Sequence, residues 1–251
     1  MNRKLVFTAA LACIAAGACT AKLSAQTTAT PPAENKDIEQ MRARLADWPA
    51  LGRYRDENAT LPNVGPNEKR VVFFGDSITD SWGRHIGVFF PGENYINRGI
   101  SGQTTPQMLI RFQQDVVYLH PAVVVILAGT NDIAGNTGPS TPQMILDNFE
   151  SMAAIAKQNN IKLVIASVLP ATAYPWRAVS QAAEKIRQLN QALKELCSRE
   201  GLIYLDYYSA MADEQGGMRP GLSSDGVHPT AKGYEIMTPL AAAAIKKVLQ
   251  E

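Results

Sequence analysis

Residues 71–79 read Val-Val-Phe-Phe-Gly-Asp-Ser-Ile-Thr, a short apolar run followed directly by a glycine, an aspartate and a serine. A solid apolar run that ends at a glycine is typical of a strand buried on both faces of a parallel sheet. Ligand crevices in open α/β sheets lie beyond the carboxyl ends of the strands. The stretch therefore predicts a buried strand with Ser77 at the edge of the sheet where chemistry takes place.

Similar apolar runs recur along the chain and alternate with segments of helical periodicity. Strand and helix in turn predict a doubly wound α/β domain with right-handed crossovers. The expected strands cover residues 70–74, 95–97, 122–127, 163–168 and 202–205. The expected helices between and after them cover residues 105–117, 142–158, 177–199 and 231–249.

The 251 residues, 46% of them hydrophobic, suffice for one large domain or for two small ones. We expect one domain over residues 37–251, in which residues 37–68 form an N-terminal helix and an irregular segment that wraps the rest. The formal net charge is +1 and no long basic stretch occurs, so a nucleic acid is not an expected partner.

The N-terminal residues have the pattern of a secretory signal, with a basic start followed by an alanine-rich apolar stretch. This stretch is too short and its side chains too small for a stable membrane span. We expect a signal peptide over residues 1–25, a flexible leader over 26–36, and export to the periplasm or the medium. Cleavage after Ala18 is an alternative, and Cys19 leaves lipid anchoring as another.

A serine hydroxyl becomes a strong nucleophile only beside a base, and the base needs a third group that orients it. Of the three histidines, His228 has a carboxylate, Asp225, at a distance of three residues, which a helical turn would place on one face. His120 precedes its strand and falls on the wrong edge of the sheet, and His85 lacks an evident carboxylate. Alternatively, Ser77 is a helix N-cap, and the aspartate and histidine form a turn or bind a metal. No further cluster of ligands accompanies that pair, so we expect no metal.

The tetrahedral intermediate of acyl transfer carries an oxyanion that needs hydrogen-bond donors. Asn131, within Gly-Thr-Asn-Asp, offers a side-chain amide, and Gly102 offers an unobstructed backbone N–H. Both residue types are also common in turns, which is the simpler interpretation of each. Tyr174 and Trp176 follow the fourth expected strand and could stack on a sugar, or they could pack within their loop.

Four segments in order resemble the sequence blocks of the GDSL or SGNH hydrolase superfamily. They are Gly-Asp-Ser-Ile-Thr at 75–79, Asn-Arg-Gly-Ile-Ser-Gly at 97–102, Gly-Thr-Asn-Asp at 129–132 and Asp-Gly-Val-His-Pro at 225–229. The superfamily includes lysophospholipases, thioesterases, platelet-activating-factor acetylhydrolase and carbohydrate O-deacetylases. The resemblance covers roughly residues 70–251 and leaves the role of residues 37–68 open.

The resemblance implies a three-layer, flavodoxin-like α/β/α fold with five parallel strands. It implies Ser77 as the nucleophile, Asp225 and His228 as its partners, and an oxyanion hole formed by Ser77, Gly102 and Asn131. No cofactor is implied. We expect a secreted esterase for short acyl esters or lysophospholipids, with a carbohydrate O-acetylesterase acting on polysaccharide as the alternative. A non-catalytic binding module would have lost the serine, asparagine or histidine, and this chain keeps all three.

Overall fold

The computed structural model describes residues 34–65 and 67–250. The expected signal peptide and residues 26–33 of the expected leader lie outside this part of the chain. The chain divides into two units, with the boundary between Arg42 and Ala43, and the second unit contains the α/β domain. Helix α1 spans Glu34–Ala46. Its start corrects the expected leader, because residues 34–36 are already helical.

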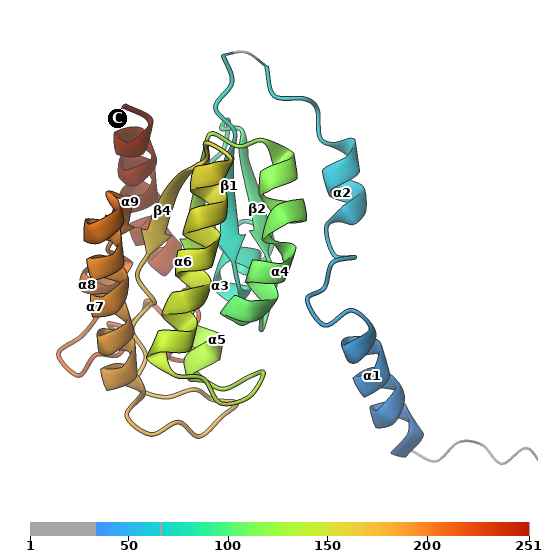
Figure 1. Cartoon of the computed structure of the whole chain (residues 1–251). Helices are drawn as coiled ribbons and strands as arrows, with labels where there is room; N and C mark the ends of the chain where they lie inside the picture. The colour runs from blue at the N-terminus through green and yellow to red at the C-terminus, as the bar shows by residue number, and fades with distance from the viewer. Residues whose placement is uncertain (1–33, 66, 251) are drawn as a thin grey trace, which may run out of the picture. The chain divides into compact units, whose positions relative to one another are not determined.

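The second unit contains a sheet of five strands, all parallel, in the order β2-β1-β3-β4-β5. Figure 1 labels β1, β2 and β4 of this sheet, with α4 and α6 in front of it. This topology confirms the predicted doubly wound α/β fold. The strand order reverses direction at β1, so the carboxyl ends of β1, β2 and β3 border one crevice. The strands are β1 (Val71–Gly75), β2 (Tyr95–Gly99), β3 (Val123–Leu127), β4 (Lys162–Ala166) and β5 (Ile203–Leu205).

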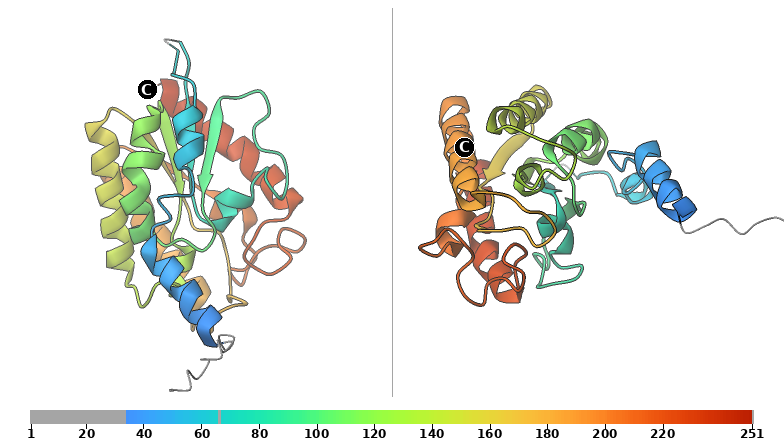
Figure 2. Two further views of the ribbon diagram at one scale, coloured as in Figure 1. Left: turned by 90° about the vertical axis from the view of Figure 1, so that its right-hand side faces the viewer. Right: turned by 90° about the horizontal axis from the view of Figure 1, so that it is seen from below.

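Helices cover both faces of this sheet, which gives the three layers (Figure 2). One face packs against α4 (Thr105–Asp115), α6 (Pro142–Gln158) and α7 (Ala182–Glu200). The other packs against α3 (Ser77–Ser81), α8 (Tyr207–Met211) and α9 (Ala231–Gln250). Short helical segments complete the fold: α2 (Arg55–Thr60), the 3₁₀ turn η1 (Val117–Leu119) and α5 (Thr130–Ile133).

The apolar run of β1 is continuous because both of its faces are buried. Val72 and Phe74 point into the core under α4, α6 and α7, and Val71 and Phe73 point into the core under α9. All four side chains are at most 3% exposed. The hydrophobic effect on both faces therefore holds β1 at the centre of the molecule, and with it the turn that carries Ser77.

Two elements differ from the sequence prediction. The helix expected from Arg177 begins only at Ala182, because residues 177–181 belong to a loop in which Arg177 pairs with Tyr174. Helix α2 lies within the segment expected to be irregular. Its sequence, Arg-Asp-Glu-Asn-Ala-Thr, buries none of its residues, so no apolar periodicity could have indicated it. No helix in the described part of the chain is long and apolar enough to cross a membrane.

Candidate active site

Ser77 is the first residue of α3 and follows the end of β1 by two residues. The N-cap is Asp76, whose Oδ1 accepts a hydrogen bond from the N–H of Ile78 at 3.0 Å. Ser77 is therefore not the cap, contrary to the alternative considered from the sequence. A Cβ at Gly75 would collide with the Thr79 side chain and lie 2.7 Å from the Leu127 carbonyl. The tight turn after β1 thus requires a glycine before the serine.

The structure brings Ser77 together with the two residues that the sequence proposed as its partners. Ser77 Oγ lies 2.9 Å from His228 Nε2, and His228 Nδ1 lies 2.6 Å from Asp225 Oδ2. Both distances lie within the range of hydrogen bonds. This is the order of groups that activates a serine: hydroxyl, imidazole, carboxylate.

Asp225 and His228 lie in the loop before α9, in a turn without helical structure. The second carboxylate oxygen of Asp225 accepts the backbone N–H groups of Val227 at 2.9 Å and of His228 at 2.8 Å. Burial alone would raise the pKa of Asp225, but the hydrogen bonds from His228 and these N–H groups lower it to about 2. The carboxylate is therefore ionised at neutral pH and can stabilise a positive charge on the imidazole.

The other two histidines stay away from this arrangement. His120 lies before β3, at the amino edge of the sheet, with an exposed side chain and a left-handed backbone. His85 is exposed, and its backbone N–H donates to the carbonyl of Ser81. The hydrogen bond to Ser77 is made by His228.

The Asn131 amide is fixed at both ends and is 2% exposed. Its Nδ2 donates to the carbonyl of Gln103 at 3.0 Å and lies 3.3 Å from Asp76 Oδ2. Its Oδ1 accepts a hydrogen bond from Asn136 Nδ2 at 2.8 Å. The amino end of the amide thus faces the aspartate beside Ser77, and the carbonyl end faces away.

Gly102 lies in the turn after β2, and this turn explains its residue type. The N–H of Gln103 donates to the carbonyl of Ile100 at 3.3 Å, and Gly102 between them has φ +78°. A turn with positive φ at its third position favours glycine. The turn interpretation therefore holds for Gly102. Because glycine has no side chain, nothing on Gly102 itself shields its backbone N–H.

Two buried carboxylates at the site were not singled out from the sequence. Asp76 is 1% exposed, and burial raises its pKa to about 7. Asp132 accepts hydrogen bonds from the N–H and hydroxyl of Thr105, yet burial still raises its pKa to about 6. Both belong to the motif segments at 75–79 and 129–132, and this membership was the available signal. Only the packing reveals that the two carboxylates are desolvated.

We expect Asp76 to make stability depend on pH. Its pKa is about 7 in the fold against an ordinary 3.8, so the folded state holds the proton more tightly than the unfolded state. The resulting stability is complete below about pH 4 and is lost as the pH rises through 7. Between pH 5.5 and 8.5, wild type should lose about 2 kcal/mol of unfolding free energy that Asp76→Asn does not lose. Urea unfolding at both pH values measures this difference.

The control for that experiment is Asp147→Asn, which removes an exposed carboxylate from α6. Its pH dependence should follow that of wild type. The same loss of stability in Asp76→Asn as in wild type would contradict the assignment to Asp76.

The two aromatic residues proposed as substrate contacts have different environments. Tyr174 is 4% exposed, so its ring is packed within the loop and is not available for stacking. Trp176 is 41% exposed, and its ring lies 5.8 Å from that of His228, measured between centroids. The indole N–H donates to Asn136 Oδ1 at 3.1 Å. Trp176 therefore forms a wall beside the histidine, in a loop that borders an open depression of about 750 Å³.

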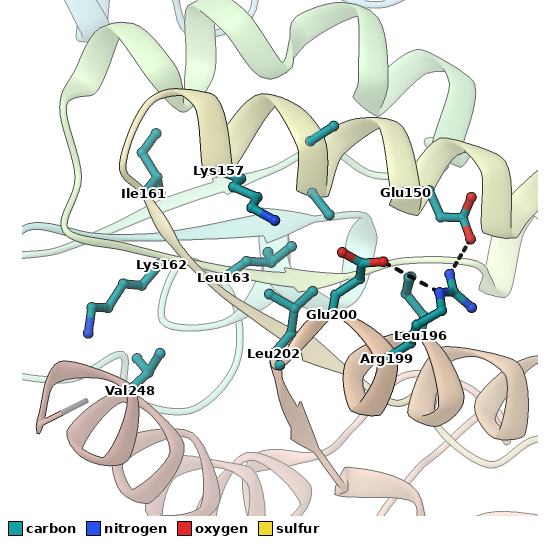
Figure 3. Close-up of a pocket in the computed structure, with 13 residues that line it drawn as sticks. Glu150, Lys157, Ile161, Lys162, Leu163, Leu196, Arg199, Glu200, Leu202 and Val248 are labelled. Atoms are coloured by element: carbon teal, nitrogen blue, oxygen red, sulfur yellow. Dashed lines mark hydrogen bonds and ion pairs between the residues drawn. The ribbon is translucent and has the colours of Figure 1, made fainter.

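A second depression, of about 660 Å³, lies at the opposite edge of the sheet (Figure 3). Lys162 at the start of β4 and Leu202 just before β5 contribute to its lining. Arg199 bridges Glu150 at 2.5 Å and Glu200 at 3.4 Å across its wall. Because these residues lie at the amino ends of the strands, this depression is remote from Ser77. Across the residues that the structure describes, no group of three or more His, Cys, Asp or Glu side chains could hold a metal ion.

A serine hydroxyl hydrogen-bonded to a histidine, which is itself hydrogen-bonded to an aspartate, is the arrangement that serine hydrolases use. Residues 73–236 match the model of the GDSL-like lipase/acylhydrolase family. The chain belongs to this family and is a carboxylic-ester hydrolase.

The chain is similar to proteins described as a GDSL-like lipase and as acetylxylan esterases. A GDSL-like lipase from Bacteroides thetaiotaomicron has a solved structure with a TM-score of 0.77 and 45% identity, over 79% of this chain and 98% of that one. An acetylxylan esterase of Geobacillus stearothermophilus is 24% identical over 74% of this chain and 95% of its own length. An acetylxylan esterase of Xylanibacter ruminicola is 25% identical over 74% of this chain, which spans 45% of that protein's length.

Proposed function

We propose that the protein is a serine esterase that removes acetyl and other short acyl groups from carbohydrate. The observation that carries the chemistry is the chain of contacts from Ser77 Oγ through His228 to Asp225, at 2.9 and 2.6 Å. The similarity to two acetylxylan esterases supports a carbohydrate substrate. Short acyl esters of simpler alcohols and lysophospholipids remain the other substrates that such a site could accept.

In the proposed mechanism, Ser77 Oγ attacks the ester carbonyl while His228 Nε2 takes its proton. The new C–O bond gives a tetrahedral intermediate, and the imidazolium is stabilised by the ionised Asp225. His228 returns the proton to the leaving alcohol, and the acetyl group stays on Ser77. Water then attacks this acyl-enzyme while His228 takes one of its protons. The second tetrahedral intermediate collapses to acetate, and His228 returns the proton to Ser77 Oγ.

Three donors are proposed for the oxyanion: the N–H groups of Ser77 and Gly102, and Nδ2 of Asn131. The N–H of Ser77 belongs to the first turn of α3, where a helix leaves N–H groups without a partner inside the helix. The amide of Asn131 is held with its amino end toward the Asp76 that precedes Ser77. Such preorganised donors supply much of the transition-state stabilisation in acyl transfer.

Trp176 is the proposed contact for the sugar ring. Its indole is partly exposed beside His228, so a pyranose that enters toward Ser77 can lie against it. An aromatic ring offers a sugar an apolar face, and its N–H here is already occupied by Asn136. This part of the proposal distinguishes a carbohydrate esterase from an enzyme for simple esters.

We expect Trp176→Ala to raise KM for acetylated xylo-oligosaccharides about tenfold and to change KM for 4-nitrophenyl acetate by less than about twofold. Losing one stacking contact corresponds to about 1–1.5 kcal/mol, and the small ester makes no such contact. Tyr118→Ala, which removes an exposed aromatic ring from η1 at the amino edge of the sheet, is the control and should leave both values unchanged. An equal loss on both substrates with Trp176→Ala would contradict a sugar contact.

The substrate class itself is tested by comparing kcat/KM across acetylated xylan, 4-nitrophenyl esters of increasing acyl length, and a lysophospholipid. The proposal predicts release of acetate from xylan and a decline of activity with acyl length. Hydrolysis of the lysophospholipid with none on acetylated xylan would reject the carbohydrate assignment and leave the esterase mechanism intact.

A further inference from the structure

Gln103 lies between the two candidate oxyanion donors that are not part of α3. It directly follows Gly102, and its own N–H closes the turn that contains this glycine. Its carbonyl accepts the hydrogen bond from Asn131 Nδ2 at 3.0 Å. The backbone of a single residue thus sets the position of the Gly102 peptide and the orientation of the Asn131 amide.

The side chain of Gln103 is fixed from both sides and is buried. Its Oε1 accepts a hydrogen bond from Arg111 Nε at 2.5 Å, and its Nε2 donates to the carbonyl of Pro49 at 2.7 Å. A buried amide with both ends satisfied has one orientation, because rotating it would leave buried polar atoms without partners.

Arg111 connects Gln103 to the backbone that precedes the nucleophile. Its guanidinium is fully buried, donates to the carbonyl of Gly75 at 3.0 Å, and pairs with Asp115 at 3.2 Å. It also lies over the ring of Phe74, 4.0 Å from its centroid. A buried charge persists only where it is paired and hydrogen-bonded, as it is here. The guanidinium of Arg111 therefore connects Gly75, which precedes Ser77, to Gln103, which closes the turn that contains Gly102.

Residues 48–58, which we call the strap, are attached to the same framework at several points. Asn58 Nδ2 donates to Asp115 Oδ1 at 2.7 Å, and the Tyr54 hydroxyl donates to the carbonyl of Gly99 at the end of β2. Gln114 Nε2, on α4, donates to the carbonyl of Leu51 at 2.7 Å. The strap lies outside the matched family segment, which begins at residue 73.

We propose that Gln103 is a positioning residue for the oxyanion hole, and that the strap, through the Pro49 carbonyl, takes part in holding it. This inference rests on the proposed function, since an oxyanion hole has a role only in acyl transfer. Donors must meet the oxyanion at 2.7–3.1 Å, so a small displacement of Gly102 and Asn131 weakens transition-state binding more than substrate binding.

The test compares Gln103→Met with Gln114→Met in the full chain. Both remove a glutamine that binds a strap carbonyl from the α4 side, and only the first touches the turn that carries Gly102. We expect Gln103→Met to lower kcat on 4-nitrophenyl acetate about 10–30-fold, with KM within about twofold of wild type. The inhibition constant of methylboronic acid, whose serine adduct is tetrahedral, should rise by a similar factor. Gln114→Met should leave all three values within about twofold, whatever its effect on thermal stability.

Gln103→Glu provides a second variant, because it keeps an acceptor for Arg111 and loses the donor to Pro49. It should recover part of kcat relative to Gln103→Met, and it decides the question if Gln103→Met does not fold. If Gln103→Met folds and has the kcat of wild type, the role of Gln103 is overturned, while the proposed function stands. If Gln103→Met does not fold, the kcat of wild type in Gln103→Glu has the same consequence. A loss confined to KM or to thermal stability would overturn the role of Gln103 as well. No turnover by the wild-type protein would instead overturn the proposed function and this role with it.

Discussion

Ser77→Ala is expected to lower kcat on 4-nitrophenyl acetate by about 10³-fold or more, with little change in KM. The hydroxyl is the only group of Ser77 that this change removes, and it is the group 2.9 Å from His228 Nε2. Without it no acyl-enzyme can form, and what remains is the stabilisation that the oxyanion donors give to direct attack by water. Initial rates over a range of ester concentrations measure both constants.

Ser151→Ala is the matched control for that change. Ser151 is exposed on α6, and its hydroxyl donates to the carbonyl of Asp147 within the same helix. Its removal should leave kcat and KM as in wild type. Turnover in Ser77→Ala at the level of Ser151→Ala would mean that the ester is cleaved by another group.

Asn131→Ala is expected to lower kcat by about 10²–10³-fold while KM stays within a few-fold of wild type. Removing one oxyanion donor typically costs about 3–4 kcal/mol in the transition state, and the ground-state carbonyl gains less from that donor. The amide is 2% exposed and faces the Ser77 turn, so water cannot replace it without rearrangement. Steady-state kinetics on 4-nitrophenyl acetate give the two constants separately.

Asn131→Asp is the variant that distinguishes a donor from a spacer. It keeps the size of the side chain and replaces Nδ2 by an oxygen, so an ionised carboxylate would repel the oxyanion. We expect activity at least as low as that of Asn131→Ala at neutral pH. Activity near wild type in Asn131→Asp would show that the side chain only fills space, and Asn131 would leave the proposed oxyanion hole.

The sheet could be predicted from the sequence because its signal is strong. Runs such as Val123–Leu127 are β-branched or aliphatic throughout, and only a strand covered on both faces buries every residue of such a run. The helices with one apolar stripe were equally visible, and α6 has the predicted bounds of residues 142–158. The end of β2 was less well predicted, because Asn97 and Arg98 are buried through hydrogen bonds that no hydropathy pattern records. The start of α7 was also placed too early.

The rule that ligands bind beyond the carboxyl ends of parallel strands brought the predicted site residues to one edge. It could not supply the geometry of the Asp225 turn, which is held by side-chain to backbone hydrogen bonds rather than by helical spacing. Nor could it find Gln103 or Arg111. Their contacts join segments that lie far apart in the sequence, such as Gln103 with Pro49 and Arg111 with Gly75.

The two aromatic residues after β4 show the same limit in another form. Tyr174 and Trp176 are two positions apart, yet one ring is buried and the other is partly exposed beside His228. Residue type alone does not tell a packed ring from a presented one, because both bury apolar area. The loop geometry decides it, and only the structure shows that geometry.

The most direct test of the account is to locate the covalent adduct that a fluorophosphonate ester leaves on the protein. The account predicts one adduct per chain, in the tryptic peptide of residues 71–84, with fragmentation placing it on Ser77 rather than Ser81. His228→Ala should label far more slowly, because the serine then lacks its base. An adduct on another residue, or labelling of Ser77 at an unchanged rate in His228→Ala, would contradict the claim that His228 activates Ser77 for attack on esters.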